Sequence, residues 1–327
     1  MSNASVENES GTGRAAGGER NARVGHETTS GLYWELLGPD EPAFRPPLLL
    51  IHGGGATGAC WRATPDGRRG WADLLAERGH RCWVTDWPGT GRSGNRNGLE
   101  IDYGAVVTGY RALLRDVIGE PVVIVCHSMG GAVTWQLVEH EPDLVAGVLS
   151  VAGAYPANVV ARSKVVSDDG HVAVVDFADT GVRMTVDRRV MNLYGDGYIY
   201  EQGIATSTRF PRERVEELRA SFVGLPPRML LQRLGVDPGM PGIDGGAGFA
   251  GKPIRLLAGG EDPAHTRAIE ERTLGLLRGW GADAELVWLP DLGFDGNGHF
   301  MFLESNSDEL LDQVVVAQLE AVGARAR

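Results

Sequence analysis

The sequence PVVIVCHSMGGAV, residues 121–133, decides the fold of this protein. Residues 122–125 are all Val or Ile, which is typical of a strand buried on both faces. In residues 132–140 the apolar side chains recur at helical spacing instead. Ser128 therefore lies where a buried strand turns sharply into a helix. A turn of this kind, called a nucleophile elbow, raises a hydroxyl above the sheet edge and over a helix N-terminus.

The elbow departs from the usual G-x-S-x-G pattern at its first position. Cys126 stands there, so the motif reads Cys-His-Ser-Met-Gly. A cysteine is small enough for the tight packing that such a corner requires. An alternative interpretation is that Ser128 only caps the following helix, as serine often does. The other motifs of the chain are needed to decide between the two.

The composition restricts the class of protein. The chain has 327 residues, of which 43% are hydrophobic and 23% are charged, and its formal net charge is -12. This size suits one large domain or a domain with an insertion. The negative charge argues against nucleic acid and against an anionic membrane as partners. Neither a long apolar segment nor a signal-peptide core is present, so we expect a cytoplasmic protein.

The cysteine pattern predicts no bound metal and no disulfide framework. The three cysteines are Cys60, Cys82 and Cys126. An odd number, with two in or beside predicted strands, indicates reduced and buried thiols. The sequence has no CxxC motif and no His/Cys cluster that would bind zinc. We therefore expect neither a metal nor another cofactor.

The hydrophobic pattern divides the chain into four parts. Residues 1–30 are rich in Gly, Ser, Asn, Glu and Arg and are predicted to be a disordered tail. Residues 31–153 and 253–327 alternate strands with helices and form the two parts of an α/β core. Residues 154–252 lack this regularity and are predicted to be an inserted cap. The alternation predicts a mostly parallel sheet with helices on both faces, with the chemistry at the C-terminal ends of the strands.

The elements that we expect are as follows. Strands are predicted at residues 31–38, 47–51, 82–85, 122–125, 144–151, 253–258 and 284–289. Helices are predicted after a turn within 64–78 and at 101–118, 266–280 and 307–322. In the cap, strands are predicted at 171–175 and 182–186 and a short helix at 212–222.

A glycine-rich loop follows the second buried strand. Residues 52–55 read HGGG, directly after the strand at 47–51. Such a loop supplies backbone N–H groups that stabilise an oxyanion, and Gly53 and Gly54 allow the main chain to approach a substrate oxygen closely. The alternative is a flexible turn without such a role. Asp86, at the end of the next strand, is expected to be structural, since a carboxylate there can accept hydrogen bonds from turn amides.

Two later loops supply a base and an acid for Ser128. His299 lies in GNGHF, residues 296–300, between the last predicted strand and the closing helix. Asp262 lies in GGEDP, residues 259–263, after a buried strand. Glu261 is the alternative acid, because a shift of one residue in the turn would exchange the two. A serine becomes nucleophilic when a histidine takes its proton and an acid holds that histidine.

Taken together, these motifs resemble the α/β-hydrolase superfamily. The elbow, the HGGG loop, the turn DWPGTGRSG and the two later segments carry the resemblance, in the chain order Ser, acid, His. Residues 64–72 (TPDGRRGWA) and 296–304 (GNGHFMFLE) are similar to stretches of a small bacterial esterase subgroup. In that subgroup the acid is a Glu at the end of the strand after the elbow helix. Residues 151–153 read VAG at this place, so Asp262 or Glu261 must serve here.

The resemblance implies a serine hydrolase that cleaves a small-molecule carboxylic ester, lactone or thioester through an acyl-enzyme. His299 would deprotonate Ser128, and the N–H groups of Met129 and Gly54 would bind the oxyanion, with Gly53 shaping the loop. A serine at this position argues against related dehalogenases and epoxide hydrolases, which use Asp. The alternatives are acyl transfer, cyclisation or C–C cleavage in a biosynthetic pathway, or a ligand-binding protein without catalysis.

Two groups of apolar residues leave their roles open. The aromatic and Met side chains of the cap can line a substrate pocket or form the core of the cap: Tyr194, Tyr198, Tyr200, Phe222 and Met229. The apolar face of the last helix is expected to be core, with a homodimer contact as the alternative.

Overall fold

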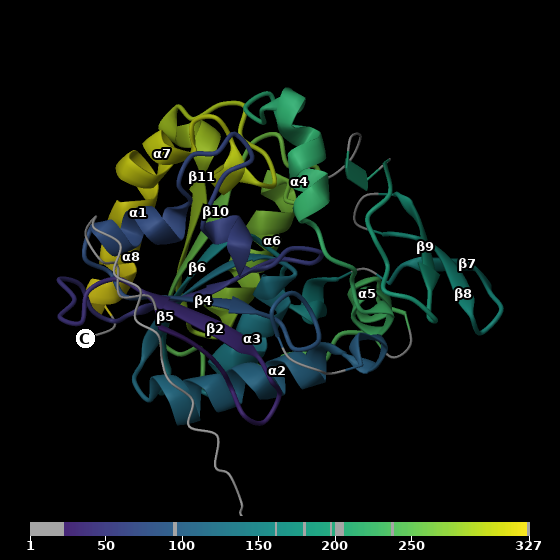
Figure 1. Ribbon diagram of the computed structural model, residues 1–327, viewed down its shortest axis with the longest axis horizontal. Coiled ribbons are helices and arrows are strands. Elements are labelled where there is room, and N and C mark those ends of the chain that lie inside the picture. The colour runs from purple at the N-terminus through teal and green to yellow at the C-terminus, as the bar shows by residue number, and fades with distance from the viewer. Residues whose placement is uncertain are drawn as a thin grey trace, which may run out of the picture.

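The computed structural model describes the chain from residue 23 to residue 325 with a few gaps, namely residues 23–93, 97–160, 162–178, 181–196, 198–199, 206–236 and 239–325. An eight-stranded sheet forms the centre of the protein (Figure 1). Its strands, in spatial order, are β1 (Arg23–His26), β2 (Tyr33–Leu37), β4 (Cys82–Asp86), β3 (Leu48–Ile51), β5 (Val122–Ser128), β6 (Val145–Gly153), β10 (Pro253–Ala258) and β11 (Asp283–Trp288). The pairs β1–β2 and β2–β4 are antiparallel, and all others are parallel.

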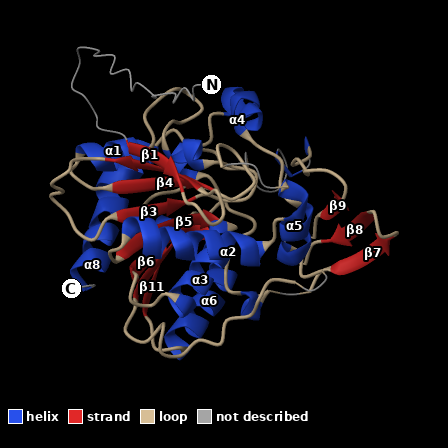
Figure 2. Ribbon diagram, turned by 60° about the horizontal axis from the view of Figure 1, so that its bottom comes forward, coloured by secondary structure: helices blue, strands red, loops and turns tan. Residues whose placement is uncertain are grey.

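Helices cover both faces of this sheet (Figure 2). On one face lie α2 (Tyr103–Ala112), its π-helical continuation η3 (Leu113–Ile118), α3 (Gly130–His140) and α6 (Arg267–Gly279). On the other lie α1 (Trp71–Glu77), α7 (Ser307–Leu310), the π-helical segment η9 (Leu311–Val315) and α8 (Val316–Arg325).

The buried strands contribute to both cores because their side chains alternate. In β3, Leu49 and Ile51 belong to the core under α2, α3 and α6, whereas Leu48 and Leu50 belong to the core under α1 and α8. The strand β5 alternates in the same way, which explains why its sequence is so strongly apolar. The apolar residues of the last helical segments are buried in the second core, so they are core residues and not a free face.

The segment between β6 and β10 is built differently. It contains η4 (Ala157–Val159), the antiparallel strands β7 (Lys164–Asp168), β8 (Val172–Asp176) and β9 (Arg183–Asp187), then η6 (Arg212–Arg214), α4 (Val215–Ser221) and α5 (Pro227–Arg233). Figures 1 and 2 show the three strands away from the main sheet, with α5 between. Val175 and Val186 pack on Leu230 and Leu234 in a small separate core.

The folded part begins earlier than the sequence predicts. The disordered tail was expected to extend to residue 30, but β1 pairs with β2 from Arg23 onward, and the carboxylate of Glu27 accepts hydrogen bonds from the backbone N–H groups of Thr29 and Ser30. The strand is exposed and held by backbone hydrogen bonds, so its sequence carries no apolar signal. Residues 1–22 lie outside the described residues.

Other predicted elements differ in detail. The helix expected at 101–118 is divided into α2 and η3, and β7 and α5 were not predicted. Cys60, Cys82 and Cys126 are free thiols, of which Cys82 and Cys126 are buried and Cys60 is half-buried. Within the described part of the chain, no helix has the length and apolar character needed to cross a bilayer.

Candidate active site

Ser128 is the last residue of β5, and α3 begins two residues later. Its φ is 48°, in the left-handed region that non-glycine residues rarely adopt. The following glycines make the sharp turn possible. A Cβ on Gly130 would lie 2.6 Å from the carbonyl oxygen of His52, and one on Gly131 would lie 2.5 Å from that of Ala154. The backbone is therefore forced to present the Ser128 side chain at the C-terminal edge of the sheet.

The structure brings His299 and Asp262 to this serine. His299 Nε2 lies 2.9 Å from Ser128 Oγ, and His299 Nδ1 lies 2.7 Å from Asp262 Oδ2. Because Nδ1 faces a carboxylate, it carries the proton, and Nε2 accepts the hydrogen bond of the hydroxyl. The other oxygen of Asp262 accepts hydrogen bonds from the backbone N–H groups of Ala264 and His265. Burial alone would raise the pKa of Asp262, but its histidine neighbours and hydrogen bonds lower that pKa to about 2.

Glu261, the alternative acid, points elsewhere. Its carboxylate accepts hydrogen bonds from the backbone N–H of Thr208 at 2.6 Å and from its hydroxyl at 3.3 Å. Of the two candidate acids, the structure therefore places only Asp262 against the imidazole.

The HGGG loop is fixed by its own histidine. His52 is fully buried, and its Nδ1 donates a hydrogen bond to the carbonyl of Gly53 at 2.7 Å, while Nε2 accepts the N–H of Trp87 at 3.2 Å. In a trans peptide the N–H points away from the preceding C=O. The Gly54 N–H is thus directed opposite to His52. Among the described residues, the N–H groups of Gly54 and Met129 have no hydrogen-bond partner.

Gly53 and Gly54 both lie in close contact with the elbow. A Cβ on Gly53 would lie 2.7 Å from Ser128 Cβ, and one on Gly54 would lie 2.3 Å from Met129 Sδ and 2.8 Å from the hydroxyl of Tyr194. Gly53 therefore has no room for a side chain, whereas a Cβ on Gly54 would displace the ends of the Met129 and Tyr194 side chains. Asp86 is structural, as predicted, because its carboxylate accepts the backbone N–H of Gly58 at one oxygen and that of Arg92 at the other.

Glu304 was not among the predicted site residues. This buried carboxylate accepts hydrogen bonds from Gly298 N at 2.8 Å, Asn297 Nδ2 at 2.6 Å and Ser207 Oγ at 2.6 Å. It thereby holds the loop that carries His299. Burial outweighs these hydrogen bonds and raises the pKa of Glu304 to about 7. The signal in the sequence was a carboxylate directly after the apolar run FMFL.

His127 supports the base from the side of the elbow strand. It is fully buried, and its Nε2 donates a hydrogen bond to the backbone carbonyl of His299 at 3.0 Å. Its ring contacts Phe300 and Phe302, and burial lowers its pKa well below the usual value. His127 is therefore neutral and structural, and it makes no hydrogen bond to Ser128.

A small cavity of about 30 Å³ opens beside Ser128. Core and insertion residues line it together, among them Met129, His299, Tyr194 and Tyr198, and Leu230 and Arg233 of α5. This volume holds a carboxylate-sized group or one to two waters, and not a whole ester substrate.

The other cap residues left open by the sequence have different positions. Met229 is buried in the main core and does not line the cavity. Phe222 packs against Tyr194 and lines a neighbouring groove of about 280 Å³. Tyr200 lies outside the described residues.

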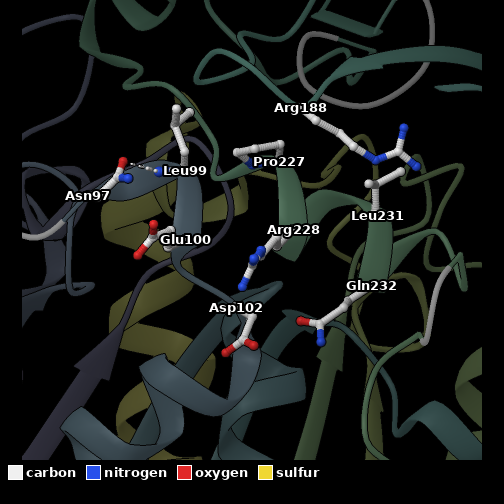
Figure 3. Close-up of a pocket in the computed structure, with 9 residues that line it drawn as sticks. All are labelled: Asn97, Leu99, Glu100, Asp102, Arg188, Pro227, Arg228, Leu231 and Gln232. Atoms are coloured by element: carbon white, nitrogen blue, oxygen red, sulfur yellow. Dashed lines mark hydrogen bonds between the residues drawn. The ribbon is translucent and has the colours of Figure 1, made fainter. Parts of the chain in front are cut away.

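A larger groove, of about 610 Å³, lies between the core and the insertion (Figure 3). Its walls come from η2 (Gly98–Glu100), the start of α2, and α5. The side-chain oxygen of Gln232 accepts the N–H of Tyr103 there. Ser128 and His299 do not line this groove, so it marks the contact between insertion and core and not the site itself.

A cluster of possible metal ligands belongs to the same site. Ligand atoms of Asp262, His265 and His299 lie within 4.8 Å of one another. Both histidines already donate a hydrogen bond from Nδ1–H to a carboxylate. His299 donates to Asp262, and His265 donates to Glu270. A metal ion there would have to replace these hydrogen bonds.

Comparison with known proteins assigns the chain to a family. Residues 48–313 match the alpha/beta hydrolase family, and the chain belongs to it. It is 23% identical to the protein named "Probable secreted lipase phiG" of Fungal sp. (strain ATCC 74256), over 87% of this chain and 84% of that protein. It is 26% identical to pimeloyl-[acyl-carrier protein] methyl ester esterase of Vibrio cholerae, over 49% of this chain and 55% of that protein.

Solved structures agree on the fold. A thermophilic esterase from Thermogutta terrifontis superposes with a TM-score of 0.59 at 19% identity, covering 93% of this chain and 99% of that one. Carboxylesterase CesB from Bacillus subtilis gives 0.58 at 16%, covering 92% of each. Haloalkane dehalogenase DbeA from Bradyrhizobium elkani gives 0.61 at 16%, covering 94% and 99%. At these identities the likeness shows the fold alone. The chain is thus an alpha/beta hydrolase with esterases and lipases among its relatives.

Proposed function

We propose that this protein is a serine hydrolase that cleaves a carboxylic ester of a small molecule through an acyl-enzyme. One observation carries the proposal: the hydrogen-bonded chain from Ser128 through His299 to Asp262, with distances of 2.9 and 2.7 Å. The names of the relatives, a lipase and a methyl ester esterase, support an ester as the substrate.

In the first step the Ser128 hydroxyl attacks the ester carbonyl while His299 Nε2 takes its proton. Asp262 fixes the tautomer of the imidazole and stabilises the imidazolium. His299 then gives the proton to the leaving alcohol, and an acyl-enzyme remains. Water attacks the acyl group with His299 again as base, and the acid is released.

The developing oxyanion would be held by the N–H groups of Gly54 and Met129. Each is on a segment that is fixed before substrate binds, the first through His52 and the second through the start of α3. Removing one donor of this kind typically costs on the order of 100-fold in rate.

Covalent labelling with a small fluorophosphonate, followed by mass mapping, tests the proposal. We expect rapid labelling at Ser128, loss of label in Ser128→Ala, and a fall of roughly 1,000-fold or more in rate in His299→Ala and Asp262→Asn. Glu261→Gln is the matched control, since its carboxylate faces Thr208, and it should label at the wild-type rate.

The outcomes separate the alternatives. A folded wild-type protein that is not labelled at Ser128 would refute the serine mechanism and favour a ligand-binding protein. Labelling without turnover of short p-nitrophenyl esters would favour acyl transfer, cyclisation or C–C cleavage by the same residues.

A further inference from the structure

A second imidazole faces the cavity beside Ser128. His265 follows Asp262 by three residues, its side chain is 2% exposed, and it lines the cavity together with Ser128 and His299. Its ring is nearly parallel to that of His299, with 5.4 Å between centroids and 25° between planes. Its Nδ1 lies 2.7 Å from the buried carboxylate of Glu270. The mechanism described above does not use this side chain.

The two nitrogens of His265 are not equivalent. Nδ1 donates to Glu270, whereas Nε2 has no hydrogen bond to any residue that the structure describes. His265 also lines the cavity, so a ligand bound there can reach this nitrogen. Burial alone would lower the pKa of His265, but the charges of Asp262 and Glu270 outweigh burial and the opposing charge of Arg233, and raise that pKa. The protonated form makes Nε2–H a hydrogen-bond donor.

A second cationic side chain lines the same cavity from the insertion. Arg233, at the end of α5, is 8% exposed. Its guanidinium carbon lies 4.9 Å from the ring centre of Phe177 and 5.4 Å from that of Tyr155. These aromatic contacts hold the planar guanidinium in place.

The rest of the cavity wall is mainly apolar. It includes Met129, Ala154, Met184 and Leu234. In such a pocket a few placed polar groups decide which ligand binds. Asp262 is already engaged by His299 and two backbone N–H groups, and Glu270 by His265, so neither carboxylate is directed at a ligand.

We propose that His265 and Arg233 recognise an anionic oxygen group, a carboxylate, on the substrate whose ester Ser128 attacks. The substrate class is a half-ester of a short dicarboxylic acid, because His265, Arg233 and Ser128 line the same small cavity, so that the carboxylate and the ester lie close together. The ester part of this inference rests on the proposed function, whereas the recognition of the carboxylate is independent of it.

Binding is therefore tested separately from chemistry, by calorimetric titration of succinate and of its neutral isostere succinamide at pH 7. We expect wild-type protein to bind succinate at least tenfold more tightly than succinamide. His265→Gln, whose amide can still donate to Glu270, and Arg233→Met should each weaken succinate binding at least tenfold and leave succinamide unchanged. Arg267→Gln is the control, since Arg267 is exposed on α6 and pairs with Glu271 and Asp291.

Equal binding of succinate and succinamide by the wild type would overturn the inference, as would an equal loss in Arg267→Gln and Arg233→Met. Hydrolysis then tests the substrate class: kcat/KM for monomethyl succinate should exceed that for dimethyl succinate, and Arg233→Met should remove this preference mainly through KM. If the protein binds succinate selectively but is not labelled by the fluorophosphonate, the serine hydrolase proposal is refuted and the carboxylate site stands. If it is labelled but binds succinate no better than succinamide, the carboxylate site is refuted and the serine hydrolase proposal stands.

Discussion

The Glu304→Gln variant tests whether the loop of the base is held by a buried carboxyl group. Burial raises the pKa of Glu304 from 4.5 to about 7, although Ser207, Gly298 and Asn297 donate hydrogen bonds to it. Between these values the folded protein keeps a proton that the unfolded chain releases. The stabilisation from this group is therefore complete below pH 4.5 and is lost as the pH rises through 7.

The size of the effect follows from the two pKa values. One unit corresponds to about 1.4 kcal/mol, and integration from about pH 5 to about pH 8 gives a loss of about 2–3 kcal/mol in the free energy of unfolding. The glutamine side chain of the variant does not titrate. Its amide oxygen can accept from Ser207 and Gly298, but its NH₂ would face the donor of Asn297, which costs about 1 kcal/mol at every pH. The stability of the wild type minus that of the variant should thus fall by about 2–3 kcal/mol over this pH range.

Urea unfolding followed by tryptophan fluorescence at pH 5, 6, 7 and 8 measures this difference. Glu309→Gln is the matched control, because Glu309 is an exposed residue of α7. The reasoning would be refuted if the difference in the free energy of unfolding between wild type and Glu304→Gln stayed constant within about 0.5 kcal/mol from about pH 5 to about pH 8. A change of the same size in Glu309→Gln would refute its assignment to Glu304.

Three further variants test other contacts. His52→Ala frees the carbonyl of Gly53 and should lower kcat for esters by about tenfold or more with little change in KM, in steady-state kinetics with melting curves as a check on folding. Gly131→Ala places a Cβ 2.5 Å from the carbonyl oxygen of Ala154 and should lower the free energy of unfolding by about 1–3 kcal/mol in urea. Asp86→Asn should cost a similar amount, about 1–3 kcal/mol, at pH 7, and the loss should shrink as the pH falls through the pKa of Asp86, which its partners lower.

Much of the sheet could be predicted because its strands carry their own signal. The strands β3, β5 and β10 are buried on both faces, so nearly every residue is apolar. The elbow could be predicted for a related reason, since Gly130 and Gly131 mark a turn that no side chain would fit. The family and its fold were predicted correctly on this basis.

The remaining features depend on contacts between distant segments. β1 is stabilised by backbone pairing with β2. Gly25 leaves room for the ring of Trp34, from which a Cβ would lie only 2.5 Å away. Neither feature produces an apolar pattern in the sequence. The choice between Asp262 and Glu261 depends on one residue of turn geometry. Glu304 gains the hydrogen bond of Ser207, and His265 the ring contact with His299, only when distant segments of the chain meet.

One short stretch of the insertion is tied to the loop of the base. Ser207 donates to Glu304, the N–H of Thr208 donates to Glu261, and the backbone N–H of Arg209 donates to the carbonyl of Gly296. Residues 207–209 are therefore hydrogen-bonded to the segments that hold His299 in place. A movement that lifted the whole insertion would pull the proton carrier away from the serine. Under the proposed function, the entry of substrate and the transfer of the proton would then be separated in time, since His299 would be displaced from Ser128 while the cavity is open.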